Sequence, residues 1–275
     1  MKTLSIVLLA FSLSLGNLIA QEISGIATYK TNRKVDLKMD GDGVTEAMQE
    51  QIQAQLRKQF QKEYTLTFTK DESIYKEVEG LNTPDPLASS GGMQITISGG
   101  NENFYRNIKE NRYVDETEIM SKPFLVKDTL EKPEWELTKE SKNIGNYTCF
   151  KATYSREVEE ETFDSATDSI VKIKKQRVTN AWYTLDIPLQ HGPGRHWGLP
   201  GLILEVTDGD MTILCSKIVL NPEKEIVIEE PSKGKEVTQE AFNEIQEKKS
   251  QEMMERFQSD SRRGDGNSFK IRIGG

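Results

Sequence analysis

The sequence predicts an α+β fold, in which a curved antiparallel β-sheet packs on an N-terminal amphipathic helix and a second helix lies near the C-terminus. Two observations support this fold class. Apolar and polar residues alternate in about ten short segments, which is the pattern of half-buried strands. The connections between these segments are short, and strands joined in this way pair antiparallel. The sheet is expected to form a half-barrel, with a closed barrel and then a sandwich as the alternatives.

The N-terminal helix is expected over Thr45–Glu63. Met48, Ile52, Leu56 and Phe60 follow one another at a spacing of four, and the other positions are mostly Gln, Glu, Lys and Arg. This spacing places one narrow apolar stripe along a helix. Helices of this kind most often cover a sheet, so we expect this one on the concave face; a membrane surface or a partner protein is the alternative.

Strands are expected on both sides of this helix. One or two lie within Ser24–Met39, another begins at Tyr64, and the acidic segment Glu157–Asp168 predicts a solvated hairpin extension. Asp208-Gly209 separates two apolar-rich runs and predicts a tight hairpin. The other expected strands are Met93–Ser98, Asn103–Ile108, Arg112–Ile119, Phe124–Lys127, Trp135–Thr138, Thr148–Tyr154, Ser169–Lys174, Val178–Asp186, Leu202–Thr207, Met211–Leu220 and Glu225–Glu229.

The chain is expected to have three parts. Residues 1–20 have the features of a secretory signal peptide, with Lys2, the apolar run Leu4–Leu15 and a cleavage point after Ala20. Residues 21–231 form a single antiparallel β-rich domain. Residues 232–275 form the C-terminal helix, over Val237–Gln258, and a flexible tail. We therefore expect an exported protein that is periplasmic or extracellular after removal of the signal peptide.

Charge and hydropathy exclude two classes of protein. The chain has 275 residues and a net charge of −8 at pH 7. Nucleic-acid binding requires a positive field that displaces counterions from phosphates, so no nucleic-acid partner is expected. Only the N-terminal apolar stretch approaches the length of a membrane span, and it is too short for one. We expect no transmembrane segment in the mature chain.

The two cysteines, Cys149 and Cys215, each lie in an expected strand. An oxidising compartment would permit a disulfide between them. Closing a loop of about 65 residues would stabilise the fold by roughly 3–4 kcal/mol. Two buried free thiols are the alternative. Neither cysteine has the spacing of a metal-ligand motif, so no metal site is predicted from them.

Residues 181–206 form the most unusual stretch of the chain. Pro188 removes a backbone donor and ends the strand that holds Trp182. The segment Gln190–Gly198 then combines glycines and a proline with His, Arg and Trp. An apolar run over Leu202–Leu204 follows and is suited to a buried strand.

Two interpretations of this stretch remain open. In the first, Trp182, Arg195, His196 and Trp197 border a ligand-binding site, because aromatic and arginine side chains on loops are frequent anchors of recognition. In the second, which we favour, the glycines and Pro200 shape a turn and the Leu-Ile run belongs to the core.

Gly198–Ile203 spells GLPGLI, and the chain resembles the GLPGLI family of exported bacterial proteins, which is named for this string. The resemblance extends to residues 64–75, to residues 145–152 and to several pieces of residues 181–193. The family has no characterised function, so the resemblance implies export and a common fold without supplying a reaction. A half-barrel wrapped on a helix is also similar to the lipoprotein carrier LolA, by fold analogy alone.

Catalytic groups are few. His191 and His196 are the two histidines, and their spacing of five in a Gly-Pro loop differs from the helical spacing of zinc proteases. No serine or cysteine lies in a nucleophile motif. We predict no catalytic residues and no cofactor, and the sequence favours a non-enzymatic protein.

Three functions are compatible with these observations. The first is a non-enzymatic binding module of the cell envelope, which holds an apolar or peptide-like ligand against the concave sheet. The second is a structural or interaction accessory of envelope machinery, with an unknown envelope protein as its partner. The third is a metal-dependent hydrolase built around His191 and His196.

Overall fold

The computed structural model describes residues 23–34, 36–40, 46, 50, 53–54, 61–78, 103–164, 169–261 and 270–274. These residues form a 12-stranded sheet, a two-stranded sheet and one long helix. In chain order the elements are β1 (Gly25–Arg33), β2 (Asp36–Asp40), β3 (Glu63–Phe68), β4 (Glu72–Glu77), β5 (Asn103–Asn107), β6 (Arg112–Ile119), β7 (Lys122–Thr129), β8 (Glu136–Ile144), β9 (Tyr147–Asp164), β10 (Ser169–Thr184), β11 (Leu202–Asp208), β12 (Met211–Leu220), β13 (Lys235–Val237), α3 (Gln239–Ser261) and β14 (Lys270–Gly274).

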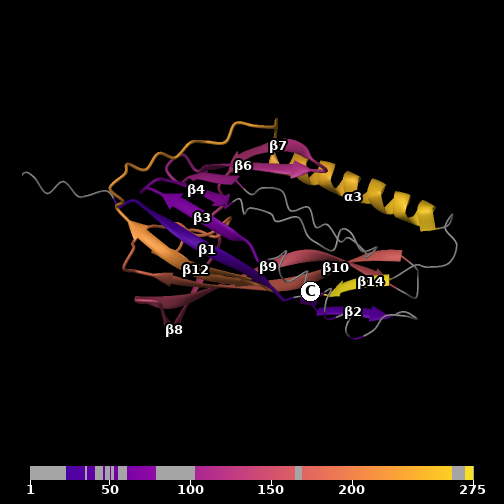
Figure 1. Ribbon diagram of the computed structural model, residues 1–275, viewed down its shortest axis with the longest axis horizontal. Helices are drawn as coiled ribbons and strands as arrows, with labels where there is room; N and C mark the ends of the chain where they lie inside the picture. Colours follow the sequence, from indigo (N-terminus) through magenta and orange to yellow (C-terminus); the bar gives the residue numbers. More distant parts are fainter. Residues whose placement is uncertain are drawn as a thin grey trace, which may run out of the picture.

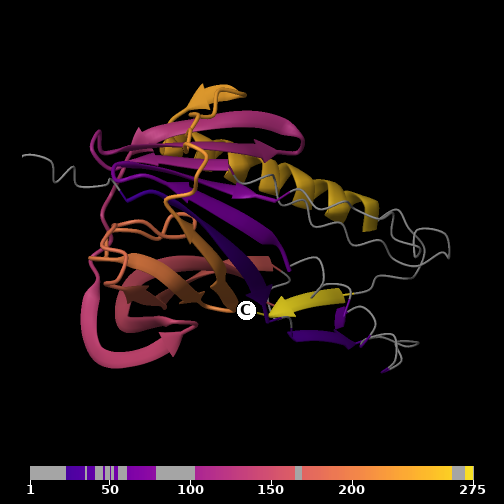
Figure 2. The same cartoon turned by 60° about the vertical axis from the view of Figure 1, so that its left-hand side comes forward.

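The large sheet is open and mostly antiparallel. Its strand order is β13-β7-β6-β5-β4-β3-β1-β12-β11-β10-β9-β8, so β13 and β8 form its edges. β1 lies inside the sheet and pairs with β3 on one side and β12 on the other, which joins the N-terminal and C-terminal strands. Only the β13–β7 pair is parallel among the described strands. The sheet is strongly curved (Figure 1 and Figure 2).

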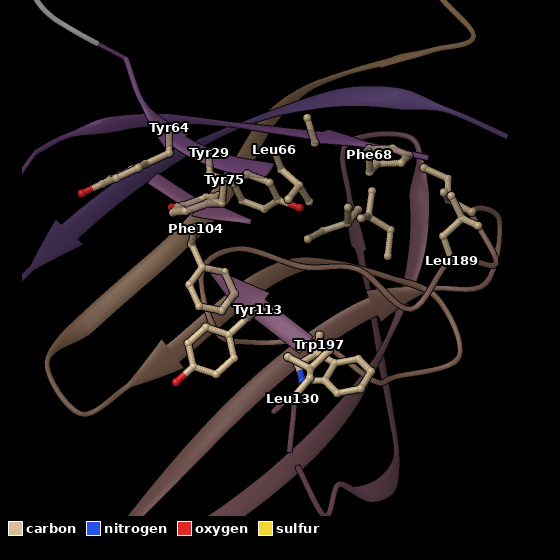
Figure 3. Packing of buried hydrophobic residues seen from close by; sticks show 14 of the residues in the cluster. Tyr29, Tyr64, Leu66, Phe68, Tyr75, Phe104, Tyr113, Leu130, Leu189 and Trp197 are labelled. Atoms are coloured by element: carbon tan, nitrogen blue, oxygen red, sulfur yellow. The ribbon is translucent and has the colours of Figure 1, made fainter. Parts of the chain in front are cut away.

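The buried face of the sheet can be followed from strand to strand by its register. Ala27 of β1 lies opposite Leu66 of β3, Leu66 lies opposite Tyr75 of β4, and Tyr75 lies opposite Phe104 of β5. All four side chains are buried. The rings of Tyr64 and Tyr75 stack with their centroids 4.7 Å apart, and Figure 3 shows the packing of these residues. Alternation of apolar and polar residues in the sequence thus produces one continuous core row.

β9 and β10 form a hairpin that extends beyond the neighbouring strands. β8 pairs with β9 as far as Thr153, and β11 pairs with β10 only from Thr179 onward. β9 and β10 continue to pair with each other out to Asp164 and Ser169. The hairpin extension predicted from the acidic segment is therefore present. We call its outer part, residues 155–164 and 169–178, the hairpin arm.

α3 docks on the sheet through its first turns. Thr238 caps the helix, because its hydroxyl oxygen accepts a hydrogen bond of 3.3 Å from the amide of Ala241. Phe242 packs edge-on against Phe124 of β7, with ring centroids 5.6 Å apart, and Ile245 adds to this contact with the core. The rest of the helix extends past the sheet in both views (Figure 1 and Figure 2). The predicted C-terminal helix is confirmed, with both ends shifted by a few residues.

No helix among the described residues combines the length and the apolar character that crossing a membrane requires.

Several expectations lie wholly or partly outside the described residues. The signal peptide of residues 1–20 and the strand Met93–Ser98 lie outside them entirely. Most of the helix expected over Thr45–Glu63, with its apolar stripe, does so as well, and Glu63 is the first residue of β3 rather than the end of a helix. Glu46, Glu50, Gln53 and Ala54 are helical, whereas residues 61 and 62 are not.

Two segments near the C-terminus differ from expectation. Glu225–Glu229 is irregular rather than a strand, because Ile228 covers a cluster on the other face of the sheet instead of pairing at its edge. Part of the expected flexible tail is ordered as β14, which pairs antiparallel with β2. Ile271 and Ile273 alternate with Lys270 and Arg272 in β14, and this period of two fits a strand.

Candidate binding site at the loop between β10 and β11

Residues 185–201 form the loop between β10 and β11, and we call them the connecting loop. Backbone hydrogen bonds fold the connecting loop back on itself. The amide of Gly198 donates to the carbonyl of Gln190 at 3.0 Å, and the amide of Ile203 donates to the carbonyl of His191 at 3.0 Å. The connecting loop is therefore a compact element attached to the first residues of β11.

Two glycines allow this close packing. A Cβ atom on Gly201 would lie 1.9 Å from the carbonyl oxygen of Thr184, at the end of β10. A Cβ atom on Gly192 would lie 2.5 Å from the carbonyl oxygen of His196. Both distances are far below van der Waals contact, so only glycine fits at these positions. This agrees with the structural interpretation of the glycines in the sequence.

The tip of the connecting loop reaches across to β5. Nη2 of Arg106 donates a short hydrogen bond to the carbonyl of Gly194. The guanidinium of Arg106 also lies 5.8 Å from the ring centroid of Trp197. Trp197 is buried and fixed by two further bonds: its indole N–H donates to the carbonyl of Glu131 at 3.2 Å, and its own carbonyl accepts from the indole of Trp135 at 2.8 Å. In the strand order, β13 to β1 form one half of the sheet and β12 to β8 form the other. The connecting loop follows β10 and contacts β5, so it links the two halves.

Arg195 lies at the rim of this contact, with half of its side chain exposed. Its Nη2 donates to Asp115 of β6 at 2.8 Å and to the side-chain oxygen of Gln239, in the first turn of α3, at 2.9 Å. Its guanidinium carbon lies 5.0 Å from the ring centroid of Tyr113 and 5.3 Å from that of Phe104. These two rings stack on each other with centroids 5.2 Å apart.

Arg106 lies directly beneath this rim and is 1% exposed. Burial, and then the charge of Arg195, lower the pKa of Arg106 to about 9. In the described part of the chain, Nε and Nη1 of Arg106 have no hydrogen-bond acceptor. Burial raises the pKa of Asp115, and the neighbouring Arg195 counteracts part of this shift. The three charged groups together carry one more positive charge than negative.

The two histidines are uncharged at neutral pH. Nε2 of His191 lies 3.0 Å from the carbonyl of Thr69, and burial followed by the charge of Arg106 lowers the pKa of His191 to about 3. Burial also lowers the pKa of His196, to about 4. The described residues contain no group of three His, Cys, Asp or Glu side chains placed to hold a metal ion. The hydrolase hypothesis thus has no metal-ligand set in this part of the chain.

The four candidate residues occupy two different settings. Arg106 lies near the ring of Trp197, and Arg106 and Arg195 both lie near the ring of Phe104. His196 lies between Arg195 and Trp197 in the chain. Trp182 lies in β10, where Lys142 of β8 stacks on its ring at 4.3 Å from the centroid. Trp182 packs against the same core cluster as Trp197, but its ring contacts a different cation. Sequence reasoning therefore identified two residues, Arg195 and Trp197, that come together beside Arg106.

Sequence reasoning missed four residues of the site. Phe104 and Arg106 alternate on one face of β5, and Tyr113 and Asp115 do the same on β6. In the register, Phe104 lies opposite Asp115 and Arg106 opposite Tyr113. The only signal was a charged residue at a core-facing position of each expected strand, which is rare without a partner.

The two cysteines are free thiols in the structure. Cys149 lies on β9 and Cys215 on β12, with β10 and β11 between them in the sheet order. Burial raises the pKa of each thiol to about 11. A disulfide between them in an oxidising compartment stays a prediction.

Comparison with known proteins adds one local match. Residues 135–205 match the model of a family described as a protein of unknown function, Porph_ging. The match covers less than half of the chain. It includes β8 to β10 and the connecting loop, with Trp182, Arg195, His196 and Trp197. No curated protein matches the chain.

Two solved structures of PNGF-II, in space groups C2 and P21, are similar to the chain. Both are 13% identical in sequence, and the TM-scores are 0.45 and 0.46. Each alignment covers 81% of this chain and 32% of the PNGF-II chain, so this chain spans about a third of the length of those proteins.

Proposed function

We propose that the protein is a non-enzymatic binding module of the cell envelope, which acts after export and holds an apolar or peptide-like ligand beside the connecting loop. The observation that supports this function is the setting of Arg195. This half-exposed arginine lies over two stacked aromatic rings, those of Phe104 and Tyr113, where the loop, β5, β6 and α3 meet. Aromatic rings with an arginine beside them form frequent anchors for ligands.

The position of the ligand follows from the same contacts. Arg195 bonds to Asp115 and Gln239 through a single nitrogen, Nη2. Its exposed half faces solvent beside the first turn of α3. The rings of Phe104 and Tyr113 are buried, so a ligand placed there would reach them by displacing the side chain of Arg195.

The proposal is tested by calorimetric titration of residues 21–275 with three probes: dodecanol, dodecanoate and an apolar tripeptide blocked at both ends. We expect saturable binding of at least one probe with one site per chain. Replacement of Arg195 by alanine should weaken this binding about tenfold, the effect of losing a binding anchor. Binding of none of the probes would contradict the proposed function.

Arg112 provides a matched control for this experiment. It also stacks on a tyrosine, with its guanidinium carbon 5.4 Å from the ring centroid of Tyr105, and it also pairs with carboxylates, those of Glu110 and Glu230. Arg112→Ala should leave the affinity unchanged, because this arginine is remote from the connecting loop in its described contacts. An equal loss in both variants would indicate a general effect of removing a surface arginine.

The second candidate function is an interaction accessory, and the hairpin arm favours it. The arm carries exposed apolar side chains, Ile173 and Val178, between charged residues. Chemical crosslinking in intact cells tests this function with the native chain and with a variant in which a two-residue turn replaces residues 157–176. Crosslinked partners that persist without the arm would contradict it.

A further inference from the structure

The clearest unexplained group in the structure is the side chain of Arg106. It projects from β5 into the core, opposite Ser73 of β4 and Tyr113 of β6 in the register. Its guanidinium carbon lies 5.4 Å from the ring centroid of Phe104 and 5.8 Å from that of Trp197. A charged group in such an apolar setting is strongly disfavoured unless an opposite charge or several hydrogen bonds accompany it.

The chain itself supplies only part of this compensation. A guanidinium carries five N–H donors. The described residues give Arg106 a single hydrogen bond, from Nη2 to the carbonyl of Gly194, while Nε and Nη1 have no acceptor. The carboxylate of Asp115 already pairs with Arg195. One positive charge in this group is therefore left without a counter-charge.

We propose that Arg106 binds the carboxylate of an apolar ligand, so that the ligand class is an amphipathic monocarboxylate. This inference rests on the proposed function and specifies the chemistry of its ligand. A single negative charge matches the single excess positive charge, whereas a dianionic phosphate would leave a negative excess in a buried site. The rings of Phe104, Tyr113 and Trp197 suit the apolar part of the same molecule.

Arg195 gives the carboxylate a path to this position. Its guanidinium lies 5.3 Å from the Phe104 centroid, and that of Arg106 lies 5.4 Å from the same centroid, so both cations lie near one ring. Arg195 is half exposed and Arg106 is buried. A carboxylate that first meets the exposed arginine would next meet the buried one, with the apolar tail following along the rings.

The test compares an acid with a neutral molecule of the same length. We expect dodecanoate to bind the native protein at least tenfold more tightly than dodecanol. In Arg106→Met, which removes the charge and keeps the length of the side chain, the affinity for dodecanoate should fall to that for dodecanol. Arg112→Met is the control and should keep the native preference. A preference that persists in Arg106→Met would overturn the inference.

The outcomes separate this inference from the proposed function. Binding of none of the three probes contradicts the function itself. Binding of the blocked tripeptide alone, or equal binding of dodecanoate and dodecanol by the native protein, overturns only the role of Arg106. If circular dichroism shows that Arg106→Met does not fold, the comparison of dodecanoate with dodecanol on the native protein still tests the inference. An apolar pentapeptide with a free or amidated C-terminus distinguishes a peptide end from a fatty acid as the source of the carboxylate.

Discussion

Arg106 and His191 are polar side chains buried where the connecting loop meets the sheet. Burial affects the charges of these two side chains differently. His191 loses its charge, because burial and the nearby Arg106 lower its pKa to about 3. Arg106 keeps its charge at neutral pH, because even a pKa of about 9 leaves a guanidinium protonated there. The neutral imidazole donates to the Thr69 carbonyl, whereas the guanidinium retains unpaired donors.

His191 makes the stability of the fold dependent on pH. An unfolded histidine binds a proton near pH 6.5, whereas folded His191 binds one only near pH 3. The unfolded state therefore holds more protons between these values, and the free energy of unfolding falls as the pH is lowered below about 6.5. Between pH 6.5 and pH 5 the loss from this group should be about 2 kcal/mol. Urea titrations at several pH values measure this loss. In His191→Gln, the free energy of unfolding should fall by about 2 kcal/mol less over this range than in the native protein.

The exposed Lys224→Gln serves as the control for this prediction, because it changes a surface side chain away from His191 and should leave the pH dependence of stability unchanged. Nitrogen-15 NMR of the two imidazoles provides a direct measurement. An imidazole signal of His191 that becomes protonated above pH 5 in the folded protein would contradict the prediction.

At the scale of the element, the connecting loop depends on its glycines for two separate reasons. Gly201 has no room for a side chain, because the carbonyl of Thr184 occupies the place of its Cβ atom. Gly194 has open space around it but a φ of +53°, which side chains other than glycine rarely adopt. The first reason is a matter of packing and the second of backbone conformation.

Alanine at each position separates these two effects. Gly201→Ala should lower the free energy of unfolding by at least about 2 kcal/mol, because either the loop or the end of β10 must move. Gly194→Ala should lower it by only about 1 kcal/mol, the cost of the left-handed conformation. Chemical denaturation followed by circular dichroism measures both. Equal losses would show that Gly201 is not packed as closely as the structure has it.

Other elements differ in how far the sequence predicts them. β3 follows from the alternation of Tyr64, Leu66 and Phe68, the hairpin arm follows from its acidic composition, and α3 follows from its apolar residues near position 242. The segment Glu225–Glu229 holds three consecutive β-branched apolar residues, which favour a strand, yet it is irregular, because Ile228 packs over the sheet instead of pairing at its edge. Residues 235–237 join β7 in a parallel pair that no local pattern indicates. A local sequence pattern carries no information about which distant segments of the chain pair with each other.

At the scale of the molecule, one sheet joins residues 25–237 through the position of β1 between β3 and β12. The hydroxyl of Tyr29 on β1 also donates to the carbonyl of Ile203 on β11 at 2.7 Å, across the intervening β12. Together with the connecting loop, these links tie the N-terminal strands to the C-terminal ones. The two halves of the sheet should therefore stabilise each other.

This linkage predicts cooperative unfolding. Trp135 and Trp182 lie among the C-terminal strands, and Trp197 lies where the connecting loop meets β5, whereas far-ultraviolet circular dichroism reports on all strands. In urea, the fluorescence and dichroism transitions should coincide, with one midpoint and one slope, as for a single domain that unfolds in one step. Two separated midpoints would show that the halves of the sheet unfold independently.

The sequence by itself determined the features that depend on neighbours along the chain. These are the strand-rich composition, the hairpins, the C-terminal helix and the glycine-shaped loop with Arg195 and Trp197, because alternation, helical spacing and turn residues act over a few positions. Only the tertiary structure decided which strands meet, that Arg106 and Asp115 lie beneath that loop, and that the ring of Trp182 contacts Lys142 rather than these charged groups. The register between strands and the curvature of the sheet bring these residues together, and both arise from contacts between parts of the chain that are far apart in sequence.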